Sequence, residues 1–545
     1  MKRRKVTPER PFKLHRYWVF TALAVVLLFS AAIRLRLLQF PLERDEGEYA
    51  YAGQLMLRGI PPYLEAYNMK LPGTYAAYAL LMAVFGQTIG GVHLGLILVN
   101  SISIVLVFVL ARRLFDPLAG VAASAAFAIL SVSPAVLGLA AHATHFVALF
   151  SLGGAILLLK ASENKRPLTL FLSGLLFGLA FTMKQPGIFF GLFGGLYLLW
   201  TELRARPIRW RQSIVRVALF ALGTIVPFGL TCLILWRAGV FSRFWFWTFS
   251  YASQYVSETS AKTAWNNFWS TMRYMTAASI WLWVLAGIGL VLLWRNRLRR
   301  VQAIFLTGLL IFALFAVCPG FYFRQHYFIV VLPVIGILGG VAVSSVGELL
   351  HNRRFSSAVQ LALPLALIIA AIGYAVFRQA HYFFEMSPAA ACNATYHGNP
   401  FAEAIAIGNY VKNNSQPSDR IAVMGSEPEI YFYASRRGST GYIYTYPLME
   451  NQAYAGAMQQ EMIRQIESAP PTYLLYINVS LSWLRKPGAP MNVFEWLQRY
   501  KQERYDLVGM VDMLSPETVY RWGSEARNYS PSSKHIEIYK LRNHP

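Results

Sequence analysis

The pattern of apolar and polar positions divides the first 377 residues into eleven long apolar segments joined by mostly short polar connections. A helix needs roughly 20 mostly apolar residues to cross a bilayer. The first segment follows a basic start, as in a signal peptide, but more apolar segments come after it, which favours an uncleaved first span. The pattern predicts spans at residues 17–35, 91–111, 117–135, 143–160, 167–183, 187–202, 214–236, 276–294, 301–318, 327–347 and 358–377.

Lys and Arg residues occur in every second connection between these segments. Short loops rich in Lys and Arg stay on the cytoplasmic side of a membrane. The alternation therefore predicts a cytoplasmic N-terminus and, after eleven spans, an extracytoplasmic C-terminus. The basic connections are the N-terminal tail, Arg112 and Arg113, residues 160–166, residues 204–211, residues 295–300, and Arg353 with Arg354.

The sequence becomes polar and mixed from about residue 378 onward. Segments typical of short strands alternate there with segments of helical spacing, which predicts a small α/β domain. The expected organisation is a transmembrane domain at 1–377, with a first outer loop at 36–90, and a soluble domain at 378–545. The strand-like segments are RIAVMG, PTYLLYIN, YDLVGMVD and HIEIYKL, and the helical ones are FAEAIAIGNYVKNN and AYAGAMQQEMIRQIESA.

The composition supports a polytopic α-helical membrane protein. Hydrophobic residues make up 56% of the chain and charged residues 14%, and the mean hydropathy of +0.40 excludes the soluble class. The net charge of +24 lies in short clusters between apolar runs. This placement indicates contact with anionic lipid headgroups and no nucleic-acid partner. The widely spaced Cys232, Cys318 and Cys392 give no argument for a disulfide framework or a cysteine metal site.

Asp45 and Glu46 follow the first span by about ten residues. Carboxylates beside anionic lipid are disfavoured unless they are paired or used. They are therefore candidates for a general base or a metal ligand near a lipid headgroup. The alternative is a solvated acidic turn that Arg44 and Arg58 neutralise.

Three cations are expected on the extracytoplasmic side, where the positive-inside rule disfavours them. Lys70 lies in YNMKLPG, Lys184 in FTMKQPG, and Arg324 lies beside His326 in PGFYFRQHYF. Each is a candidate for binding a phosphate, for which Arg offers bidentate hydrogen bonds and Lys a point charge. For Lys70 the alternative is snorkelling to bulk lipid, and for Arg324 and His326 it is interfacial anchoring.

His142 and His145 in AAHATHF are three residues apart at the start of a predicted span, so they are expected on one helical face. Two such histidines can share a divalent metal ion, although the sequence names no third ligand. The aromatic stretch RFWFWTFSYASQYV suits a helix in the headgroup region, either as an ordinary aromatic belt or as part of a substrate groove. Together, carboxylates, cations and aromatic surface on one side are what transfer from a lipid phosphate donor needs.

The motifs RDEGEYAYAGQLMLRG, MKLPGTYAAYALLMAVFG, HATHFVALFSLGGAILLLK and GLAFTMKQPG, in this order, resemble the bacterial branch of the dolichyl-phosphate-mannose protein mannosyltransferase family. That branch is similar to the lipid A aminoarabinose transferases, and all are C-type glycosyltransferases (GT-C). The resemblance covers about residues 15–350. It implies a GT-C membrane bundle whose first outer loop holds a catalytic acid, and a polyprenyl-phosphate sugar as donor.

The resemblance also implies roles for individual residues. Asp45 would be the catalytic base with Glu46 as its neighbour, and Lys70 and Lys184 would stabilise the departing lipid phosphate during inversion at the anomeric carbon. The sequence departs from the family at Leu71, which separates Lys70 from Pro72, and at Gln185, which replaces a glycine. His142 and His145 stand where relatives commonly carry Asp. The acceptor, whether protein, lipid or polysaccharide, stays open, as does the metal.

Two other classes compete with the enzyme. A transporter or flippase of lipid-linked sugars or polysaccharide would also be polytopic and basic, but it would need polar residues along its spans. The centres of the predicted spans are almost wholly apolar. A scaffold with a passive membrane anchor would not need ordered motifs in the outer loops. The sequence therefore favours the glycosyltransferase.

Overall fold

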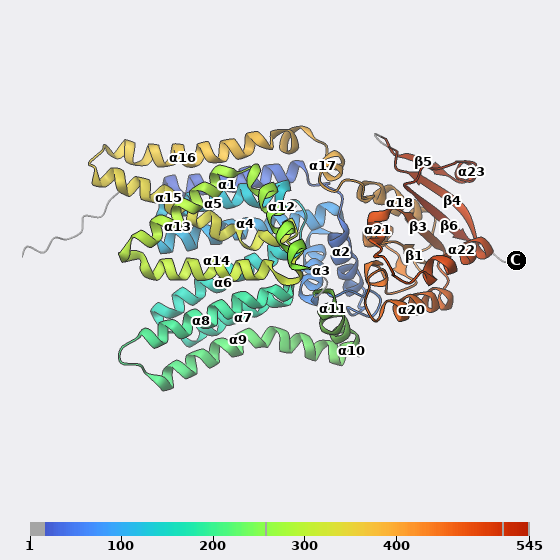
Figure 1. Cartoon of the computed structure of the whole chain (residues 1–545), viewed down its shortest axis with the longest axis horizontal. Helices are drawn as coiled ribbons and strands as arrows, with labels where there is room; N and C mark the ends of the chain where they lie inside the picture. The colour runs from blue at the N-terminus through green and yellow to red at the C-terminus, as the bar shows by residue number, and fades with distance from the viewer. Residues whose placement is uncertain (1–16, 257–258, 515–516, 543–545) are drawn as a thin grey trace, which may run out of the picture.

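The computed structural model describes residues 17–256, 259–514 and 517–542. A bundle of long helices forms one end of the molecule, and a mixed α/β part forms the other (Figure 1). The chain enters the bundle at the end farthest from the sheet and finishes in the sheet.

Each of the eleven apolar segments coincides with a helix, so the predicted helices are confirmed. Among the described residues, eight helices are long and apolar enough to cross a membrane, α5 and α7 are shorter, and α13 follows α12 at a bend of 106°. The count of eleven spans therefore stays a prediction. The helices are α1 (Tyr17–Arg36), α4 (Ile89–Leu114), α5 (Pro117–Val132), α6 (Ala143–Asn164), α7 (Pro167–Met183), α8 (Ile188–Arg204), α9 (Trp210–Arg237), α13 (Ile280–Arg295), α14 (Arg300–Val317), α15 (Leu332–Asn352) and α16 (Ser357–Arg378), with α12 at Ala261–Ala277.

Local sequence signals fix where these helices begin. Proline is the first residue of α5 and α7, a position where its missing N–H costs nothing. The Asp116 side chain accepts a hydrogen bond from the Ala119 N–H at 2.9 Å and caps α5. The helices then pack closely where a residue is small. A side chain at Gly174 of α7 would collide with the backbone of α9, and one at Gly289 of α13 with the backbone of α15.

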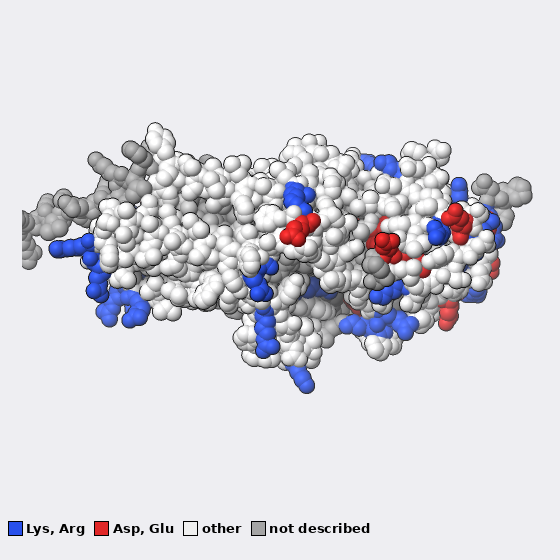
Figure 2. All heavy atoms as spheres, turned by 90° about the horizontal axis from the view of Figure 1, so that it is seen from above, with Lys and Arg blue, Asp and Glu red and all other residues white. Residues whose placement is uncertain are grey.

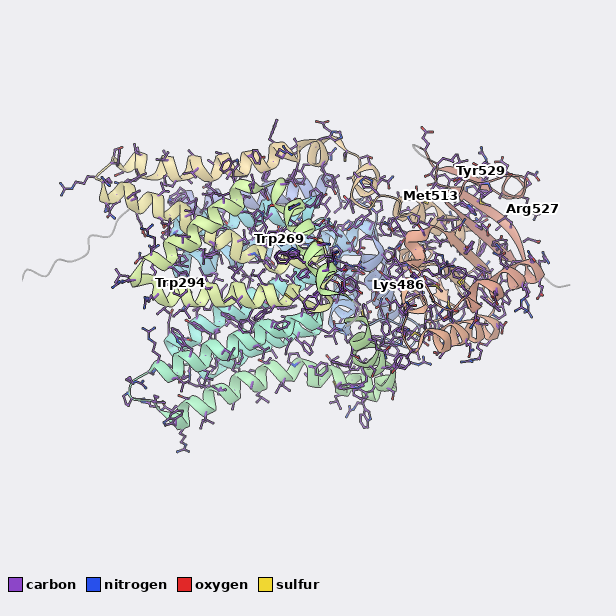
Figure 3. All side chains as sticks on the ribbon, in the orientation of Figure 1. Trp269, Trp294, Lys486, Met513, Arg527 and Tyr529 are labelled. Carbon is purple, nitrogen blue, oxygen red and sulfur yellow. The ribbon has the colours of Figure 1, made fainter. Side chains whose placement is uncertain are left out.

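The surface of the bundle has the character expected of a lipid-facing wall. Figure 2 shows a stretch of bundle surface almost free of charged side chains between a group of Lys and Arg at the far end and mixed charges over the α/β part. Two partly exposed tryptophans lie at different levels along the bundle, Trp294 toward the far end and Trp269 on α12 toward the α/β part (Figure 3). Tryptophan prefers the two interfaces of a membrane. The structure is that of a multi-pass membrane protein.

Three of the basic connections share one end of the bundle. The turns between α8 and α9, between α13 and α14, and between α15 and α16 all lie at the end away from the sheet (Figure 1). The outer loop 36–90 lies at the opposite end and folds into two helices, α2 (Arg44–Leu57) and α3 (Pro72–Phe85). The aromatic stretch is helical as α10 (Phe241–Trp245), η3 (Phe246–Tyr251) and α11 (Ala252–Val256).

The C-terminal part contains a six-stranded sheet with the strand order β2-β1-β3-β6-β4-β5. Strands β2, β1 and β3 are parallel, and β6, β4 and β5 are added antiparallel. The four predicted strands are confirmed as β1 (Arg420–Met424), β3 (Tyr473–Asn478), β4 (Tyr505–Asp512) and β6 (His535–Leu541). The short β2 (Arg437–Gly438) and β5 (Val519–Trp522) were not predicted. Helices α17 (Pro388–Thr395), α18 (Phe401–Asn413), α19 (Pro428–Ala434), α20 (Ala455–Ser468), α21 (Ser480–Trp483), α22 (Asn492–Arg504) and α23 (Ser524–Arg527) complete it.

The outer loop joins the two parts. Glu65 forms ion pairs with Arg420, at 3.2 Å, and with Arg437. The Tyr67 N–H donates to the Gly441 carbonyl at 2.7 Å. Helix α2 packs on α19 so closely that a side chain at Gly47 would overlap the backbone of Glu429. The loop between the first two long helices is therefore a structured layer between bundle and sheet.

Candidate active site

The start of helix α2 places Asp45 beside Lys70 of the outer loop and Tyr444 of the C-terminal part. Glu43 and Glu46 form a capping box, in which the Glu46 N–H donates to the Glu43 carboxylate at 3.0 Å and the Glu43 N–H donates to Glu46 at 3.4 Å. Asp45 lies in the first turn of α2, where the helix dipole favours a negative charge.

Asp45 forms a largely buried ion pair with Lys70. The Lys70 ammonium lies 3.0 Å from Asp45 Oδ1, and the two side chains are 18% and 16% exposed. Burial alone would raise the pKa of Asp45, but the Lys70 charge, with His142 and Arg324, holds it below its usual range. The carboxylate therefore stays ionised and can accept a proton only if Lys70 is drawn toward another anion.

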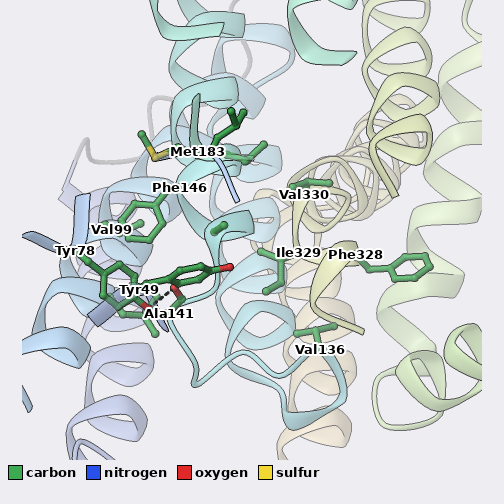
Figure 4. Close-up of a cluster of buried hydrophobic side chains, with 14 of the residues drawn as sticks. Tyr49, Tyr78, Val99, Val136, Ala141, Phe146, Met183, Phe328, Ile329 and Val330 are labelled. Carbon is green, nitrogen blue, oxygen red and sulfur yellow. Dashed lines mark hydrogen bonds between the residues drawn. The ribbon is translucent and has the colours of Figure 1, made fainter. Parts of the chain in front are cut away.

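Lys70 is held by contacts to its own loop. The Tyr63 hydroxyl donates to the Lys70 carbonyl at 2.6 Å, and the Lys70 ammonium also lies 3.2 Å from the Tyr49 hydroxyl. Behind Tyr49, the Tyr78 ring packs edge-on, and its hydroxyl donates to the Ala141 carbonyl at 2.7 Å (Figure 4). This aromatic wall fixes the direction of the ammonium group.

Glu48 is a second buried carboxylate beside Lys70. Its side chain accepts hydrogen bonds from Asn68, at 2.6 Å, and from the Tyr75 hydroxyl. Burial, with the nearby Asp45 charge, raises the pKa of Glu48 to about 7. Glu48 orients the 68–70 segment and was missed in the sequence, where it is one acid among several in RDEGEY.

Lys184 lies between α7 and α8, and its ammonium stands 3.8 Å from the centre of the Tyr327 ring. Burial, and then the nearby Lys70 charge, lowers the pKa of Lys184 to about 7. An anion that enters beside this buried lysine stabilises its protonated, charged form.

One cavity of about 180 Å³ is lined by Asp45, Lys70 and Lys184 together. It also contains apolar surface from Val147, Ala316 and Val330. An anionic group could therefore meet several cations here while an apolar chain lies against the bundle. The polar side chains predicted from sequence that line this cavity are Asp45, Lys70, Lys184, Arg324 and His326.

A second cavity, of about 420 Å³, is also lined by Asp45, Arg324 and His326. His142 lines this cavity only, whereas Lys70 and Lys184 line only the first. Asp45 thus stands between two cavities of different character.

Three residues are placed so that they could hold a metal ion. One ligand atom each from Asp45, His142 and His326 lies within 4.8 Å of the others. The two imidazole rings are stacked at 4.1 Å, and burial lowers the pKa of both, that of His142 to about 4. His145 is buried in α6 and does not belong to this group, although the sequence paired it with His142.

Glu46 lies away from the cavities. It is fully buried, accepts a hydrogen bond from the Ala141 N–H at 2.6 Å, and lies 3.2 Å from His93 Nε2. These contacts tie α2 to α4 and to the segment that precedes α6. The geometry gives Glu46 a role in positioning α2, and its predicted catalytic role has no support from these contacts.

The C-terminal part supplies side chains that the sequence did not single out. The Tyr444 hydroxyl lies 3.4 Å from Asp45 Oδ1, and Tyr446 lines the first cavity.

Arg44, which was expected to neutralise the acidic turn, instead pairs with the fully buried Glu427 at 3.0 Å. Arg58 donates to the Ser435 carbonyl. The acidic turn is therefore neither solvated nor neutralised by these arginines.

We expect Glu427→Gln to lower the free energy of unfolding by about 3 kcal/mol, because it leaves the buried Arg44 without its counter-ion. Thermal unfolding of the protein in detergent measures this loss. Glu163→Gln is the matched control, since Glu163 pairs with Arg113 on an exposed surface and such pairs contribute little. Equal melting temperatures for the two variants would contradict the role given to Arg44 and Glu427.

The fold is that of a polytopic helical membrane protein with a C-terminal sheet domain, and solved structures share it. Among solved structures, ArnT from Cupriavidus metallidurans bound to undecaprenyl phosphate is similar with a TM-score of 0.60 at 14% identity, over 98% of this chain and 100% of that chain. The archaeal oligosaccharyltransferase AglB from Archaeoglobus fulgidus, in complex with an inhibitory peptide and a dolichol-phosphate, is similar with a TM-score of 0.53 at 13% identity, over 93% of this chain and 74% of that chain.

Sequence comparison confirms the resemblance that the motifs indicated. The family model described as dolichyl-phosphate-mannose-protein mannosyltransferase matches residues 70–231. Over 219 residues the chain is 30% identical to the undecaprenyl phosphate-alpha-4-amino-4-deoxy-L-arabinose arabinosyl transferase of Pseudomonas aeruginosa (strain UCBPP-PA14). That match covers 37% of this chain and only 38% of the relative. The family match includes Lys70 and Lys184, whereas Asp45 and Arg324 lie outside it.

Proposed function

We propose that the protein is an inverting glycosyltransferase that uses a polyprenyl-phosphate sugar as donor on the extracytoplasmic side of the membrane. The observation that carries the proposal is the Asp45–Lys70 ion pair beside a partly apolar cavity that also contains Lys184 and Arg324. The relatives whose names include undecaprenyl phosphate or dolichol-phosphate support the donor class.

In the proposed reaction, the donor phosphate enters the first cavity and takes Lys70, Lys184 and Arg324 as partners. Drawing Lys70 toward the phosphate weakens its hold on Asp45, whose carboxylate is then able to accept the proton of an acceptor hydroxyl or amine. The acceptor attacks the anomeric carbon as the bond to the phosphate oxygen breaks. The three cations stabilise the negative charge that develops on the departing lipid phosphate.

A divalent ion would be held by Asp45, His142 and His326. Both ring nitrogens of His142 and Nδ1 of His326 are buried without a hydrogen-bond partner among the described residues, which fits metal ligation. A bound ion would supply positive charge beside the reacting groups. Asp45 Oδ1 is already engaged by Lys70, so Oδ2, which lies 3.9 Å from His326 Nε2, is the oxygen suited to an ion.

The same proposal assigns the sides of the membrane. The basic turns share the end of the bundle opposite the cavities, and such turns stay in the cytoplasm. The N-terminus is then cytoplasmic, and residues 378–545 form an extracytoplasmic domain that covers the active site. The protein would lie in the plasma (inner) membrane, with a protein, lipid or polysaccharide as acceptor.

The Lys184 amine gives the reaction an expected pH dependence. Because its pKa is lowered to about 7, the cation that binds phosphate is lost as the pH rises through neutrality. We expect the KM for the donor to rise between pH 7 and pH 9 in the wild type. Lys184→Arg keeps its charge over this range and should flatten the profile. Parallel profiles for the two proteins would show that Lys184 does not bind the donor as a titrating cation.

Mass spectrometry of polyprenyl-phosphate sugars and surface glycans from cells with and without the gene tests the proposed function. We expect the deletion to accumulate one donor and to lose one glycan modification. The transporter class is separated with purified protein in liposomes, because an enzyme releases polyprenyl phosphate from the donor and a transporter leaves the donor intact. An intact donor in the presence of envelope extract would overturn the proposal.

A further inference from the structure

The second cavity differs from the first in composition. It lies where α12, the 319–326 segment and the 396–401 segment meet, at the end of the bundle that faces the sheet (Figure 1). Its lining includes the side-chain amides of Asn267, Gln325 and Asn399 and the hydroxyls of Ser270 and Thr271. Amides and hydroxyls both donate and accept hydrogen bonds. This lining suits a molecule with many groups that both donate and accept hydrogen bonds.

The charges around the second cavity are balanced. Glu43 and Asp45 are its acids, and Arg44 and Arg324 are its permanent cations. Outside the lining, Glu427 pairs with Arg44 at 3.0 Å and Lys70 pairs with Asp45 at 3.0 Å, so one acid and one cation are added. Net charge therefore favours neither a phosphorylated nor a cationic molecule, and a neutral ligand fits best.

Aromatic side chains complete the cavity, and one of them has an unused hydroxyl. Tyr322, Tyr396 and Phe401 all line it. The Tyr396 hydroxyl is buried and has no hydrogen-bond partner among the residues that the structure describes. Buried polar groups are normally hydrogen-bonded, so this hydroxyl has an unused capacity to bond to a ligand. Aromatic faces beside amides match a sugar ring, which presents C–H faces as well as hydroxyls.

We propose that the second cavity binds the acceptor of the reaction and that the acceptor is a neutral carbohydrate, with Tyr396 as a recognition residue. This inference rests on the proposed glycosyltransferase function. A carbohydrate hydroxyl in the second cavity forms a bond to the anomeric carbon of the donor, and the bond between that carbon and the phosphate oxygen breaks. The hydroxyl proton passes to Asp45, which lines both cavities, and the polyprenyl phosphate leaves with the electron pair.

The other two acceptor classes fit the second cavity less well. A lipid tail suits the first cavity, with its larger share of apolar surface, better than a space lined by amides and hydroxyls. A serine or threonine side chain of a protein offers one hydroxyl and would leave most of these polar groups unmatched. A sugar unit with several hydroxyls can pair with more of them.

The test uses the full-length protein in liposomes, with isotope-labelled polyprenyl-phosphate sugars extracted from the membranes of the source cells. Protein, glycan and lipid fractions of the cell envelope are offered as acceptors in separate reactions. We expect the label to appear in the glycan fraction through a new glycosidic bond. Label in the protein or lipid fraction, or only in free sugar, overturns the carbohydrate acceptor while leaving transferase activity established. A donor that stays intact with all fractions shows instead that the proposed function itself has failed.

Tyr396→Phe tests the site of binding. Loss of one hydrogen bond should raise the KM for the glycan fraction by about fivefold, with kcat and the KM for the donor nearly unchanged. Tyr382→Phe is the matched control, because the Tyr382 hydroxyl bonds to Thr395 at 2.9 Å and its residue does not line the cavity. An unchanged acceptor KM in Tyr396→Phe, or an equal rise in both variants, overturns the assignment of Tyr396.

Discussion

Asp45→Asn is expected to lower kcat for sugar transfer by at least about 100-fold, the usual contribution of a positioned general base. The substitution keeps the shape of the side chain and its place in the first turn of α2 but removes the proton acceptor. The assay is release of polyprenyl phosphate by purified protein in liposomes.

Binding of the donor should survive this change or improve. Lys70 is held at 3.0 Å by Asp45, and the donor phosphate competes with Asp45 for it. An amide holds the ammonium less strongly than a carboxylate, so Lys70 is freer to bind phosphate in Asp45→Asn. The expected result is therefore an equal or lower Kd for polyprenyl phosphate together with a large loss of kcat.

Asp506→Asn is the control for Asp45→Asn. Asp506 pairs with Arg542 on an exposed surface of the α/β part, at 3.0 Å, and should leave kcat unchanged. Melting temperatures of both variants show whether the fold is intact. Turnover retained in well-folded Asp45→Asn would remove Asp45 from the role of base.

The bundle could be predicted from the sequence because its physical signal is local. Each long helix must satisfy its own backbone and present apolar side chains to lipid, so hydropathy alone locates it. Hydropathy determines the number of membrane crossings less well than the positions of the helices. Helices α5 and α7 have 16 and 17 residues, and a bend of 106° separates the amphipathic α12 from the apolar α13. Length and composition do not decide whether such elements cross the membrane.

The cations of the site were predictable for a related reason. Lys70, Lys184 and Arg324 stand out because the topology predicted from the sequence places them where the positive-inside rule disfavours cations, and the structure brings them to one cavity. The histidine pair shows where such reasoning fails. His142 is the N-cap residue of α6 with an extended backbone, so helical spacing does not place it on the same face as His145. Its neighbour in space is His326, which is 184 positions away in the chain.

Tyr444 and Glu427 could not be found from sequence patterns. Each meets its partner in the outer loop across more than 380 residues, Tyr444 with Asp45 and Glu427 with Arg44. Contacts of this kind depend on how α19 packs against α2, which no periodicity encodes. The buried charge of Arg44 requires a counter-ion, but only the folded chain shows which acid supplies it.

Lys70→Met is expected to lower kcat/KM for the donor by about 100-fold to 1,000-fold, the range for removing one stabilising group from a developing oxyanion. The loss should appear in both parameters, because Lys70 would bind the phosphate in the ground state and stabilise it as the leaving group. Lys70→Arg should retain more activity, because its charge persists, but less than the wild type. The planar guanidinium does not reproduce the single ammonium that lies 3.0 Å from Asp45 and 3.2 Å from the Tyr49 hydroxyl.

Lys501→Met separates loss of catalysis from loss of stability. Lys501 on α22 forms a similarly buried ion pair with Glu537 on β6 at 2.8 Å, away from both cavities. Its removal should cost stability as Lys70→Met does, while kcat/KM at a temperature below unfolding stays near the wild-type value. A comparable loss of activity in both variants would mean that Lys70 acts only by holding Asp45 and the outer loop in place. A loss confined to Lys70→Met, together with weaker binding of polyprenyl phosphate, is the result that its place in the cavity predicts.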